Sequence, residues 1–546
     1  MKNRQYPFYN SDSFQTVREL LDIAEKKYGE RDAYIYKIRK NTYKKTYAEF
    51  ISEVHALARY FIKEGYTSQR IAILGENSYE WIVTWFAVVI SGNTAVPLDK
   101  MLSEEQLKFV LADTGASLLI YSNQFAEYVP SFKAANELLK EICMEKDLQS
   151  CLESGKAALM AENKTAIDVK IKPSDTAIII YTSGTTGIAK GVMLSHSNLC
   201  SDAMGVSKHA ESSGNNLFVL PLNHAYAIIA LLVVINKGKA SCINSGLKRF
   251  AAEIKEYKPH EMYLVPLIVE NLYSKIMDKA KSEGKLKQLK FLMKVSLFLY
   301  SIGIDVRRKL FARVLSEFGG KLEILICGGA ALDPDYVKAF RAFGINILIG
   351  YGISECSPVI SVNRNNHYRD GSVGLPLSGV EVKTDAADGR SEGELYVRGG
   401  IIMKGYWNNK KATEETFDGE WFKTGDIGYI DKDGFIYITG RKKNVIILSN
   451  GKNLYPEELE MQLVKLPAIA EVLVYEENKA VTAEIFPDED YIIENEIADI
   501  KEHIEALVEK FNKQLPACKS ITAVKLRNTC FEKTSTKKII RKRIAS

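Results

Sequence analysis

The sequence lacks the features that mark several classes of protein. Its eight cysteines are scattered from Cys143 to Cys530 without a CxxC pair, which predicts buried, reduced thiols rather than a disulfide scaffold. Its seven histidines show no metal-ligand spacing, so no structural metal is implied. The longest apolar runs, such as residues 225–235, fall short of the ~20 residues that a membrane-spanning helix needs. No signal-peptide core follows Met1, so we expect a cytoplasmic protein.

The chain also lacks a strong excess of charge. A net charge of +5 is slight for 546 residues and gives no support to a nucleic-acid partner. The hydrophobic fraction of 46% and the charged fraction of 26% are ordinary for a globular protein. The length exceeds one ordinary core, so more than one domain is expected.

Most of the chain alternates between short apolar runs and amphipathic helical patterns. Residues 70–99 predict a strand, an Asn-capped turn, a helix, a Gly break and a second strand. Continuously apolar strands separated by helix-length segments favour parallel α/β layers that are covered on both faces. Further strands are expected at 116–122, 176–184, 217–222, 261–266, 322–330 and 345–352.

After about Gly371 the pattern changes. Residues 393–399 and 426–441 alternate around turn pairs such as Asp433-Gly434, which predicts antiparallel hairpins. From Asn444 the pattern predicts a small α+β unit with a strand at 471–475 and helices at 456–466 and 495–514. The fold class is therefore α/β: we expect a large, multilayer N-terminal domain with a β-rich end (1–440) and a small C-terminal domain (441–546).

The stretch "YTSGTTGIAKG" (Tyr181–Gly191) is rich in glycine and hydroxyl side chains. It follows an apolar strand and precedes a helix-like segment at 195–206. Glycines let backbone N–H groups turn toward one point, and the hydroxyls add donors, so the loop is suited to phosphate oxygens. It does not fit the Walker A pattern. Composition alone leaves a surface turn as an equal alternative.

This loop resembles the phosphate loop of the adenylate-forming superfamily of acyl-CoA synthetases, adenylation domains and luciferases. "GYGISE" (Gly350–Glu355) resembles that family's GYGxTE motif, with Ser354 in place of threonine. Residues 421–446 resemble its ribose-and-hinge signature, and "KTSTKKI" (Lys533–Ile539) its C-terminal lysine motif. The resemblance covers nearly the whole chain and is strongest to bacterial long-chain fatty acid–CoA ligases.

The resemblance implies activation of a carboxylic acid by MgATP, followed by transfer of the acyl group to CoA or a pantetheine carrier. Because a carboxylate then approaches an anionic phosphate, the reaction needs positive charge and orientation. Glu355 would bind Mg²⁺ with Thr185, Ser354 the α-phosphate, Tyr351 adenine, and Asp426 with Arg441 the ribose. The remaining nucleotide contacts implied are Thr182, Ser183, Gly184, Thr186, Gly187, Lys190, Gly329, Ala330, Gly352 and Tyr437.

Three lysines matter in the C-terminal part of the resemblance. Lys538 would bridge the carboxylate and the α-phosphate, because an ammonium is a compact charge that can lie between two anions. The family usually has glycine before this lysine, whereas this chain has Lys537, so the spacing favours Lys538 and leaves Lys537 as the alternative. Lys443 would lie at the hinge about which a mobile C-terminal domain rotates. The loop 449–456 departs from the family's Gly-Gly-Glu-Asn pattern at Asn450 and Lys452.

The acid is expected to be apolar. Residues 225–235, after His224, contain no charge, whereas amino-acid adenylation domains usually place an aspartate there. An ammonium would lack a partner in such a wall. The resemblance places His224, Gly328 and Gly350 in the acyl pocket. The alternative is that this run is only a core helix.

The stretch Lys279–Val314 contains ten Lys and Arg against two acids, interleaved with apolar residues. It resembles the helical insert of long-chain synthetases, and peripheral contact with a membrane surface is one interpretation. A solvated helical face is the other.

Rival functions remain. The acceptor could be an acyl carrier protein, the acid could be aryl, or the chain could be a degenerate adenylate- or acyl-binding protein. "GRSEG" (Gly389–Gly393) fits GxSxG but lies in a turn, which argues against a serine hydrolase. His196 is expected only to begin a helix.

The lysine motif generates a first prediction. Lys538→Ala should slow acyl-adenylate formation by ~10²-fold or more, because a stabilising charge is lost, while thioester formation from supplied acyl-adenylate changes little. Pyrophosphate release and thioester formation are measured separately. Lys537→Ala is the matched control; a larger effect there, or equal loss in both half-reactions, contradicts the assignment.

Overall fold

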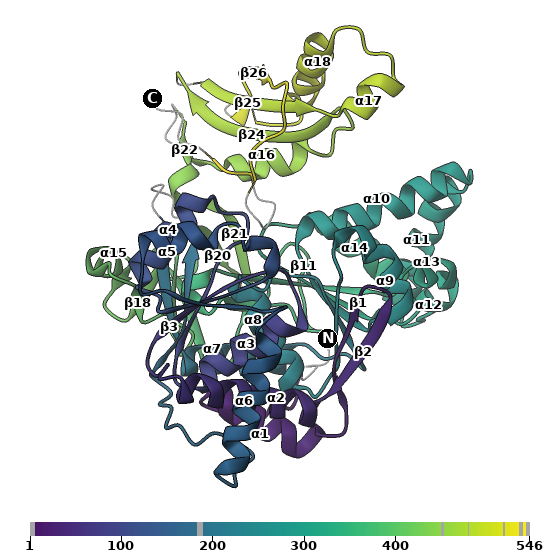
Figure 1. The fold of residues 1–546 in the computed structure, drawn as a ribbon. Coiled ribbons are helices and arrows are strands. Elements are labelled where there is room, and N and C mark those ends of the chain that lie inside the picture. Colours follow the sequence, from purple (N-terminus) through teal and green to yellow (C-terminus); the bar gives the residue numbers. More distant parts are fainter. Residues whose placement is uncertain are drawn as a thin grey trace. The chain divides into compact units, whose positions relative to one another are not determined.

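The computed structural model describes residues 6–182, 189–448, 453–478, 480–516, 519–533 and 539–541. The chain forms two compact units, the first comprising Met1–Glu381 with Val397–Phe422 and the second Val382–Tyr396 with Lys423–Ser546. The large α/β unit and the smaller unit confirm the predicted fold class (Figure 1). The predicted domain boundary between residues 440 and 441 stays a prediction.

A seven-stranded sheet organises the first part of the large unit. β3, β4, β5, β6 and β7 run parallel, as expected, whereas β8 pairs antiparallel with β7 and with β18. The loop after Thr182 therefore joins two antiparallel strands instead of leading directly into a helix. The strands, in sheet order, are β18 (Gly405–Tyr406), β8 (Lys190–Ser195), β7 (Thr176–Thr182), β4 (Thr94–Pro97), β3 (Arg70–Leu74), β5 (Leu118–Tyr121) and β6 (Lys140–Cys143).

A nine-stranded sheet organises the rest of this unit. Its centre is parallel and its edges, β15-β14-β13 and β1-β2, are antiparallel. The strands, in sheet order, are β15 (Leu375–Pro376), β14 (Val359–Val362), β13 (Asn346–Gly352), β12 (Ile324–Cys327), β11 (Glu261–Leu264), β9 (Asn216–Phe218), β10 (Ser241–Ile243), β1 (Asp32–Ile38) and β2 (Asn41–Thr46).

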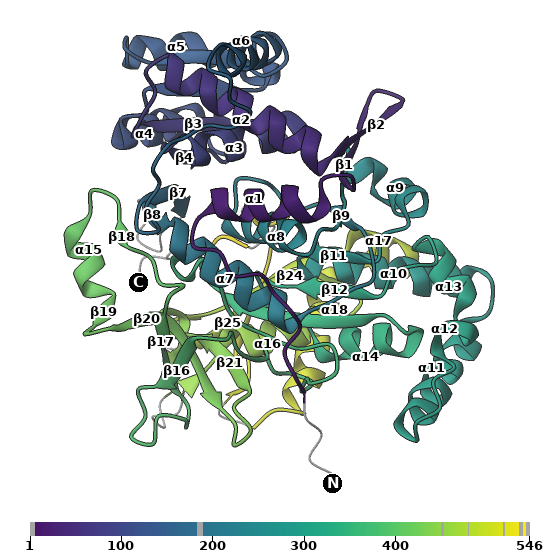
Figure 2. The ribbon, with the colours of Figure 1, turned by 90° about the horizontal axis from the view of Figure 1, so that it is seen from below.

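Helices with few polar residues fill the space between the sheets. α3 (Tyr79–Ile90) and α8 (Ala225–Asn236) each bury all but one of their residues. α7 (His196–His209) contacts both β8 and β14, which belong to different sheets, and α1 (Val17–Tyr28) packs on α7 and α8. Figure 2 shows α1, α7 and α8 between the strands of the two sheets. A helix that is apolar on every side is stable only where it is buried on every side.

The other helices of this unit cover the outer faces. α4 and α5 pack on the seven-stranded sheet through residues such as Leu107, Val110 and Phe132. α10, α11 and α14 pack against the core of the nine-stranded sheet, which includes Phe340 and Phe343. The bounds are α2 (Tyr47–Lys63), α4 (Glu104–Thr114), α5 (Val129–Ala135), α6 (Leu148–Ala161), α9 (Phe250–Tyr257), α10 (Pro266–Ser282), α11 (Leu286–Ser301), α12 (Arg307–Leu310), α13 (Ala312–Glu317), α14 (Pro334–Phe343) and α15 (Lys410–Glu415).

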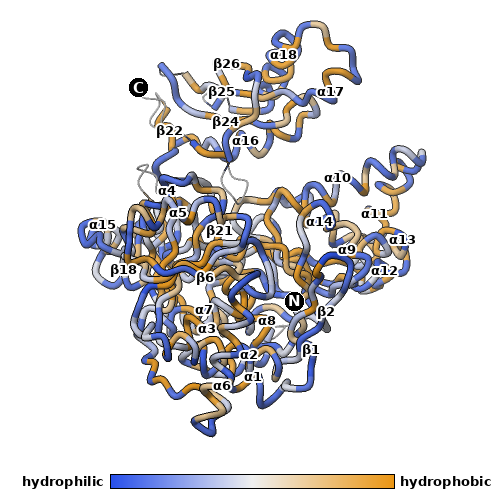
Figure 3. Tube along the Cα trace, in the orientation of Figure 1, coloured by the Kyte–Doolittle hydropathy of each residue, from blue (hydrophilic) through white to orange (hydrophobic). Residues whose placement is uncertain are grey.

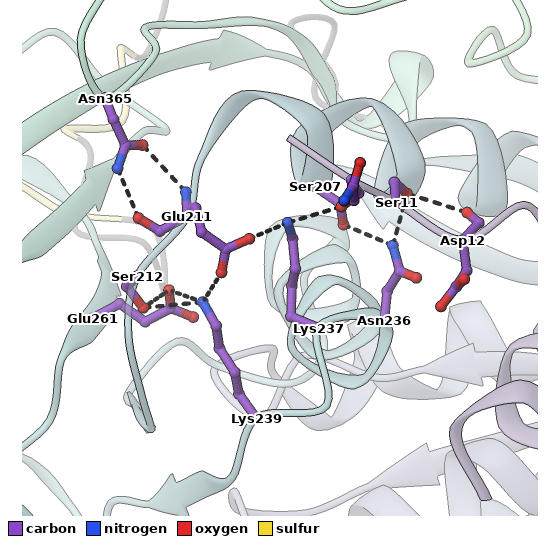
Figure 4. Close-up of polar contacts among 11 residues, drawn as sticks. Ser11, Asp12, Ser207, Glu211, Ser212, Asn236, Lys237, Lys239, Glu261 and Asn365 are labelled. Carbon is purple, nitrogen blue, oxygen red and sulfur yellow. Dashed lines mark hydrogen bonds and ion pairs between the residues drawn. The ribbon is translucent and has the colours of Figure 1, made fainter. Parts of the chain in front are cut away.

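A polar network fixes the segment that follows α8 (Figure 4). Lys237 forms an ion pair with Glu211, and Lys239 Nζ lies 2.9 Å from Glu261 Oε2 and 3.4 Å from Glu211 Oε1. Ser212 Oγ donates to Glu261 over 2.6 Å. The side chains of the two lysines are only 7% and 9% exposed, so the carboxylates are important partners for their charges. The network links the end of α8 to the segment after α7 and to the start of β11.

The second unit has its own core. β24 (Ile469–Glu477) pairs antiparallel with β25 (Ala480–Pro487), which pairs parallel with β26 (Ala523–Leu526). α16 (Pro456–Leu463), α17 (Glu489–Glu494) and α18 (Ile500–Asn512) accompany them, and residues such as Leu463, Ile485 and Ile504 are fully buried. Residues 380–441 are divided between the two units and form β16 (Val380–Thr384), β17 (Gly393–Gly399), β19 (Phe417–Asp418), β20 (Trp421–Ile430) and β21 (Ile436–Arg441). The pair β22 (Ile446–Ile447) and β23 (Asn453–Leu454) follows in the second unit.

Several local expectations need correction. The cap of α3 is Ser78, whose side chain accepts from Trp81 N, whereas the neighbouring Asn77 donates to Leu220 O over 2.7 Å. The expected helix at 495–514 begins only at Ile500, because Asp499 supplies its N-cap. Six of the seven cysteines that the structure describes are buried, and Cys530 is exposed. In the described ranges, no helix has both the length and the apolar character needed to cross a bilayer.

Candidate active site

Two glycines meet at the carboxyl end of the nine-stranded sheet. Cys327 of β12 pairs with Ile349 of β13, so Gly328 and Gly350 follow side by side. A Cβ added to Gly328 would lie 3.3 Å from Gly350 O and 3.7 Å from the Tyr226 ring. Ligands of open α/β sheets bind outside the carboxyl ends of the strands, and these small residues leave room there.

The start of α8 lies at the same place. The Tyr226 hydroxyl donates to Ile326 O over 2.9 Å, which joins α8 to β12. Burial raises the pKa of Tyr226, so the phenol stays protonated and able to donate. His224 occupies the N-cap position of this helix. The structure thus brings the start of α8 beside Gly328 and Gly350, the three parts of the predicted acyl pocket.

The "GYGISE" motif crosses from a strand into a short turn. Tyr351 and Gly352 end β13, and Ser354 and Glu355 follow in a 3₁₀ turn, Ser354–Cys356. A Cβ on Gly352 would lie 1.8 Å from Pro358 O, so the strand can pass Pro358 only with glycine at this position. The same Cβ on Gly350 would meet nothing closer than 3.6 Å.

Glu355 is oriented by a residue far away in sequence. The Tyr406 hydroxyl of β18 donates to Glu355 Oε1 over 2.8 Å. Burial raises the pKa of Tyr406, and the Glu355 carboxylate raises it further. The ammonium of Lys190 lies 4.9 Å from the centre of the Tyr406 ring, within cation–π range. These three side chains, from the 3₁₀ turn Ser354–Cys356, β18 and β8, form one cluster.

This cluster lies at the base of the predicted phosphate loop. Thr182, the last residue of β7, pairs with Lys190, the first residue of β8. Tyr181 donates a hydrogen bond to Asp113, which links the end of β7 to α4. Ser183, Gly184, Thr185, Thr186 and Gly187 lie outside the described residues. Within the described part, the structure therefore brings Thr182 and Lys190 close to Glu355.

Gly329 and Ala330 follow Gly328 at the end of β12, and both are exposed. Gly329 has a φ of +90°, which a side chain would disfavour. Both residues therefore lie at the carboxyl edge of the sheet, and their contact with a nucleotide stays a prediction.

The two residues expected to bind the ribose, Asp426 and Arg441, belong to the second unit. Asp426 of β20 pairs across the strands with Arg441 of β21, and Arg441 Nε lies 2.7 Å from Asp426 Oδ1. The carboxylate side chain is 4% exposed, so the guanidinium is an important partner for its charge. This pair orients the Asp426 carboxylate as an acceptor.

Tyr437 belongs to β21, and Lys443 follows shortly after the end of that strand. Tyr437 stacks on Tyr429 with ring centres 4.8 Å apart and planes at 5°. Lys443 is in the 3₁₀ turn Lys442–Asn444. Desolvation lowers the pKa of Lys443, and the cations of Arg441 and Arg541 lower it further. Lys537 and Lys538 lie outside the described residues.

Two contacts in the site were missed from the sequence. Tyr406 lies in a two-residue strand that no sequence pattern singled out, and Tyr226 was counted only as part of the charge-free run 225–235. Their function depends on a hydroxyl that meets a partner distant in the chain, which no local pattern reports. His196 begins α7, as expected, and its Nδ1 accepts from Val17 N over 3.3 Å. "GRSEG" lies in the connection between β16 and β17, as expected.

Comparison with known families gives two matches. The profile of the AMP-binding enzymes matches residues 21–407, and that of the AMP-binding enzyme C-terminal domain matches residues 443–546. The long-chain-fatty-acid–CoA ligase FadD15 of Mycobacterium bovis is 31% identical over 452 residues, which are 79% of this chain and 74% of that protein. The chloroplastic long-chain-fatty-acid–[acyl-carrier-protein] ligase AEE15 of Arabidopsis thaliana is 27% identical over 91% of this chain and 80% of its own length.

Solved structures share the fold. The o-succinylbenzoate CoA synthetase of Bacillus subtilis, in complex with ATP and magnesium, has a TM-score of 0.73 at 22% identity and is covered over 98% of its length, against 96% of this chain. The anthranilate CoA ligase AuaEII, in complex with anthranoyl-AMP, has a TM-score of 0.75 at 21% identity, over 98% of this chain and 96% of its own.

Gly352 and Gly350 generate a matched pair of variants. Gly352→Ala should lower the apparent midpoint of thermal unfolding by several degrees, because a clash with a backbone oxygen costs roughly 1–3 kcal/mol or more. Gly350→Ala, two residues away, should change it little. Circular dichroism during heating measures both. Equal midpoints for the two variants would contradict the close approach of Gly352 to Pro358.

Proposed function

The chain belongs to the AMP-binding enzyme family, and from this premise we propose that it is an ATP-dependent fatty acid–CoA ligase. It activates a medium- or long-chain fatty acid as an acyl-adenylate and transfers the acyl group to the thiol of CoA, with release of pyrophosphate and AMP. The observation that carries the proposal is the apolar helix α8, whose start lies at Gly328 and Gly350, while Glu355, Lys190 and Thr182 cluster in the same unit.

The first half-reaction joins two anions. The fatty acid carboxylate attacks the α-phosphorus of ATP, an oxygen–phosphorus bond forms, and the bond to pyrophosphate breaks. Lys190 supplies positive charge beside Thr182 and the phosphate loop, and Lys538 supplies a second cation between the reacting groups. Positioned charge of this kind is the main source of catalysis in such transfers.

Two residues of the second unit bind the nucleoside in this proposal. Asp426 accepts hydrogen bonds from the ribose hydroxyls, and Arg441, 2.7 Å away, orients its carboxylate. Tyr351, at the end of β13, stacks on adenine. In the second half-reaction the thiolate of CoA attacks the acyl carbon, and AMP leaves with the electron pair of the broken bond. Rotation about Lys443 separates the two half-reactions.

Glu355 fits a magnesium ion that travels with ATP. One carboxylate oxygen accepts from Tyr406, and the other, Oε2, makes no hydrogen bond or ion pair within the part of the chain that the structure describes. The described residues contain no group of three or more His, Cys, Asp or Glu that could form an all-protein metal site. Mg²⁺ is usually held by one or two carboxylates together with substrate phosphates and water, which matches a single available oxygen. Bound there, the ion would neutralise phosphate charge.

The substrate class rests on the wall that α8 provides. Eleven of its twelve residues are buried, and none of the twelve is charged. A fatty acyl chain gains from burial against such a surface, whereas an α-ammonium would have no partner there. The similarity to FadD15 supports the same class.

Transfer to an acyl carrier protein is the second candidate. It is favoured by the similarity to AEE15, whose name specifies that acceptor. Both acceptors present the same pantetheine thiol. CoA and a holo acyl carrier protein, compared at equal concentration with one fatty acid, separate the two: the physiological acceptor gives the larger kcat/KM.

The substrate proposal predicts a chain-length profile. With saturated acids from C4 to C18, kcat/KM for pyrophosphate release should rise by up to ~4-fold per carbon, because each buried methylene contributes at most ~0.8 kcal/mol. It should level or fall once the pocket is full. Phenylalanine and benzoate are the controls. A flat profile, or preference for either control, contradicts a fatty acid substrate and favours another acid.

The Mg²⁺ proposal predicts the effect of removing one hydroxyl. Tyr406→Phe should raise the Mg²⁺ concentration for half-maximal adenylate formation by roughly tenfold or more, because a hydrogen bond to a carboxylate contributes about 1.5–3 kcal/mol. Calorimetry of ATP binding with and without Mg²⁺ gives a readout independent of turnover. Tyr43→Phe, on the exposed strand β2, is the matched control. Identical Mg²⁺ dependence in the two variants would remove Tyr406 from the metal site.

A further inference from the structure

The inner and outer faces of α11 differ sharply. Leu289, Leu292 and Met293 pack against the core of the nine-stranded sheet. Ser296 is fully buried, and its Oγ donates to Ala342 O of α14 over 2.7 Å. These contacts fix the rotation of the helix about its axis. On the opposite side of α11, residues that are three, four or seven positions apart share one face, and this face points away from the core.

That opposite side carries large apolar side chains. Phe291 is 65% exposed and Phe298 is 64% exposed, and Ile302, which follows at the helix end, is 57% exposed. Their spacing of seven and four residues places them along one stripe. Single exposed apolar residues are common, but two phenylalanines and an isoleucine in one stripe mark a surface that binds something.

Unpaired lysines flank the stripe. Lys287, Lys290 and Lys294 are exposed, and none of them has an ion pair or hydrogen bond to another described residue. Some other cations of the same stretch have acidic partners: Lys279 pairs with Glu317, Arg313 with Glu283 and Arg307 with Asp305. Lys281 and Lys309 are exposed and also lack an ion pair to a described residue, so the three lysines of α11 belong to a wider positive surface and are the ones beside the apolar stripe. Figure 1 shows α11 in the hairpin with α10, and Figure 3 shows both hydrophilic and hydrophobic residues along it.

We propose that the outer face of α11, defined by Lys287, Lys290, Phe291, Lys294 and Phe298, docks on an anionic phospholipid bilayer. Phenylalanines enter the boundary between headgroups and acyl chains, while lysines keep their ammonium groups at the phosphates and bury their stems. The choice of a bilayer over an acidic protein rests in part on the proposed function, since a fatty acid substrate partitions into lipid.

The test is flotation of the full chain with vesicles in the absence of any substrate. Vesicles of phosphatidylcholine are compared with vesicles of phosphatidylcholine and phosphatidylglycerol in equal parts, at low and high salt. The chain should float with the anionic vesicles at low salt and much less with neutral ones. Its partition should weaken as salt rises, because screening reduces the attraction of the lysines.

Two variants separate the apolar and charged contributions. The first variant combines Phe291→Ser with Phe298→Ser, and the second combines Lys287→Gln, Lys290→Gln and Lys294→Gln. Each variant should lower the partition coefficient at least about tenfold. Leu138→Ser with Met160→Ser is the matched control, since these side chains are 84% and 77% exposed elsewhere in the same unit. Unchanged thermal unfolding and unchanged pyrophosphate release with a short, soluble acid establish that each variant is folded.

Three outcomes overturn the proposal. They are absence of flotation with anionic vesicles at low salt, equal flotation of all variants, and loss of transfer to a holo acyl carrier protein with vesicle binding intact. The last would identify the face as a protein-binding surface. Because flotation is measured without substrate, its failure leaves the acid-panel result untouched, and failure of the acid panel leaves flotation untouched.

Discussion

The position of α8 follows from one constraint: a helix that is apolar on every side has to be covered on every side. α1 and α7 pack on it, and the hydroxyl of Tyr226 joins its start to β12. At its other end, the carboxylates of Glu211 and Glu261 fix the lysines that follow the helix. Buried ion pairs of this kind add little net stability, but breaking one exposes an uncompensated charge, so they define position. The two ends together fix α8 against the strand that leads to Gly328.

The residues of the candidate site then collect at strand ends because parallel strands end at a common edge. β12 and β13 deliver Gly328 and Gly350 to that edge, and the antiparallel return of β14 forces Gly352 to pass Pro358 with no side chain. The turn that follows presents Glu355, and β18 brings Tyr406 to it. A small number of backbone pairings thus determines where each functional group lies.

Most strands, their alternation with helices along the chain, and the glycine-rich motifs could be predicted from the sequence, because each of these depends on a local pattern. The strand leading to Thr182 and the helix beginning at His196 were located correctly, but β8 between them was missed, since Val192, Met193 and Leu194 are too short a run to identify a strand. The cap of α3 was assigned to asparagine, although Ser78 makes the bond and Asn77 reaches a distant loop. Tyr406 and Tyr226 could not be found, because their partners are distant in the chain.

The two carboxylates described above carry their charge in different ways. Glu355 accepts a hydrogen bond from a neutral phenol, whereas Asp426 lies 2.7 Å from the guanidinium of Arg441. An approaching cation therefore meets electrostatic repulsion from Arg441 at Asp426, but none from Tyr406 at Glu355. The first carboxylate is suited to a cation and the second to neutral hydrogen-bond donors. This difference follows from the partner that a neighbouring strand supplies to each.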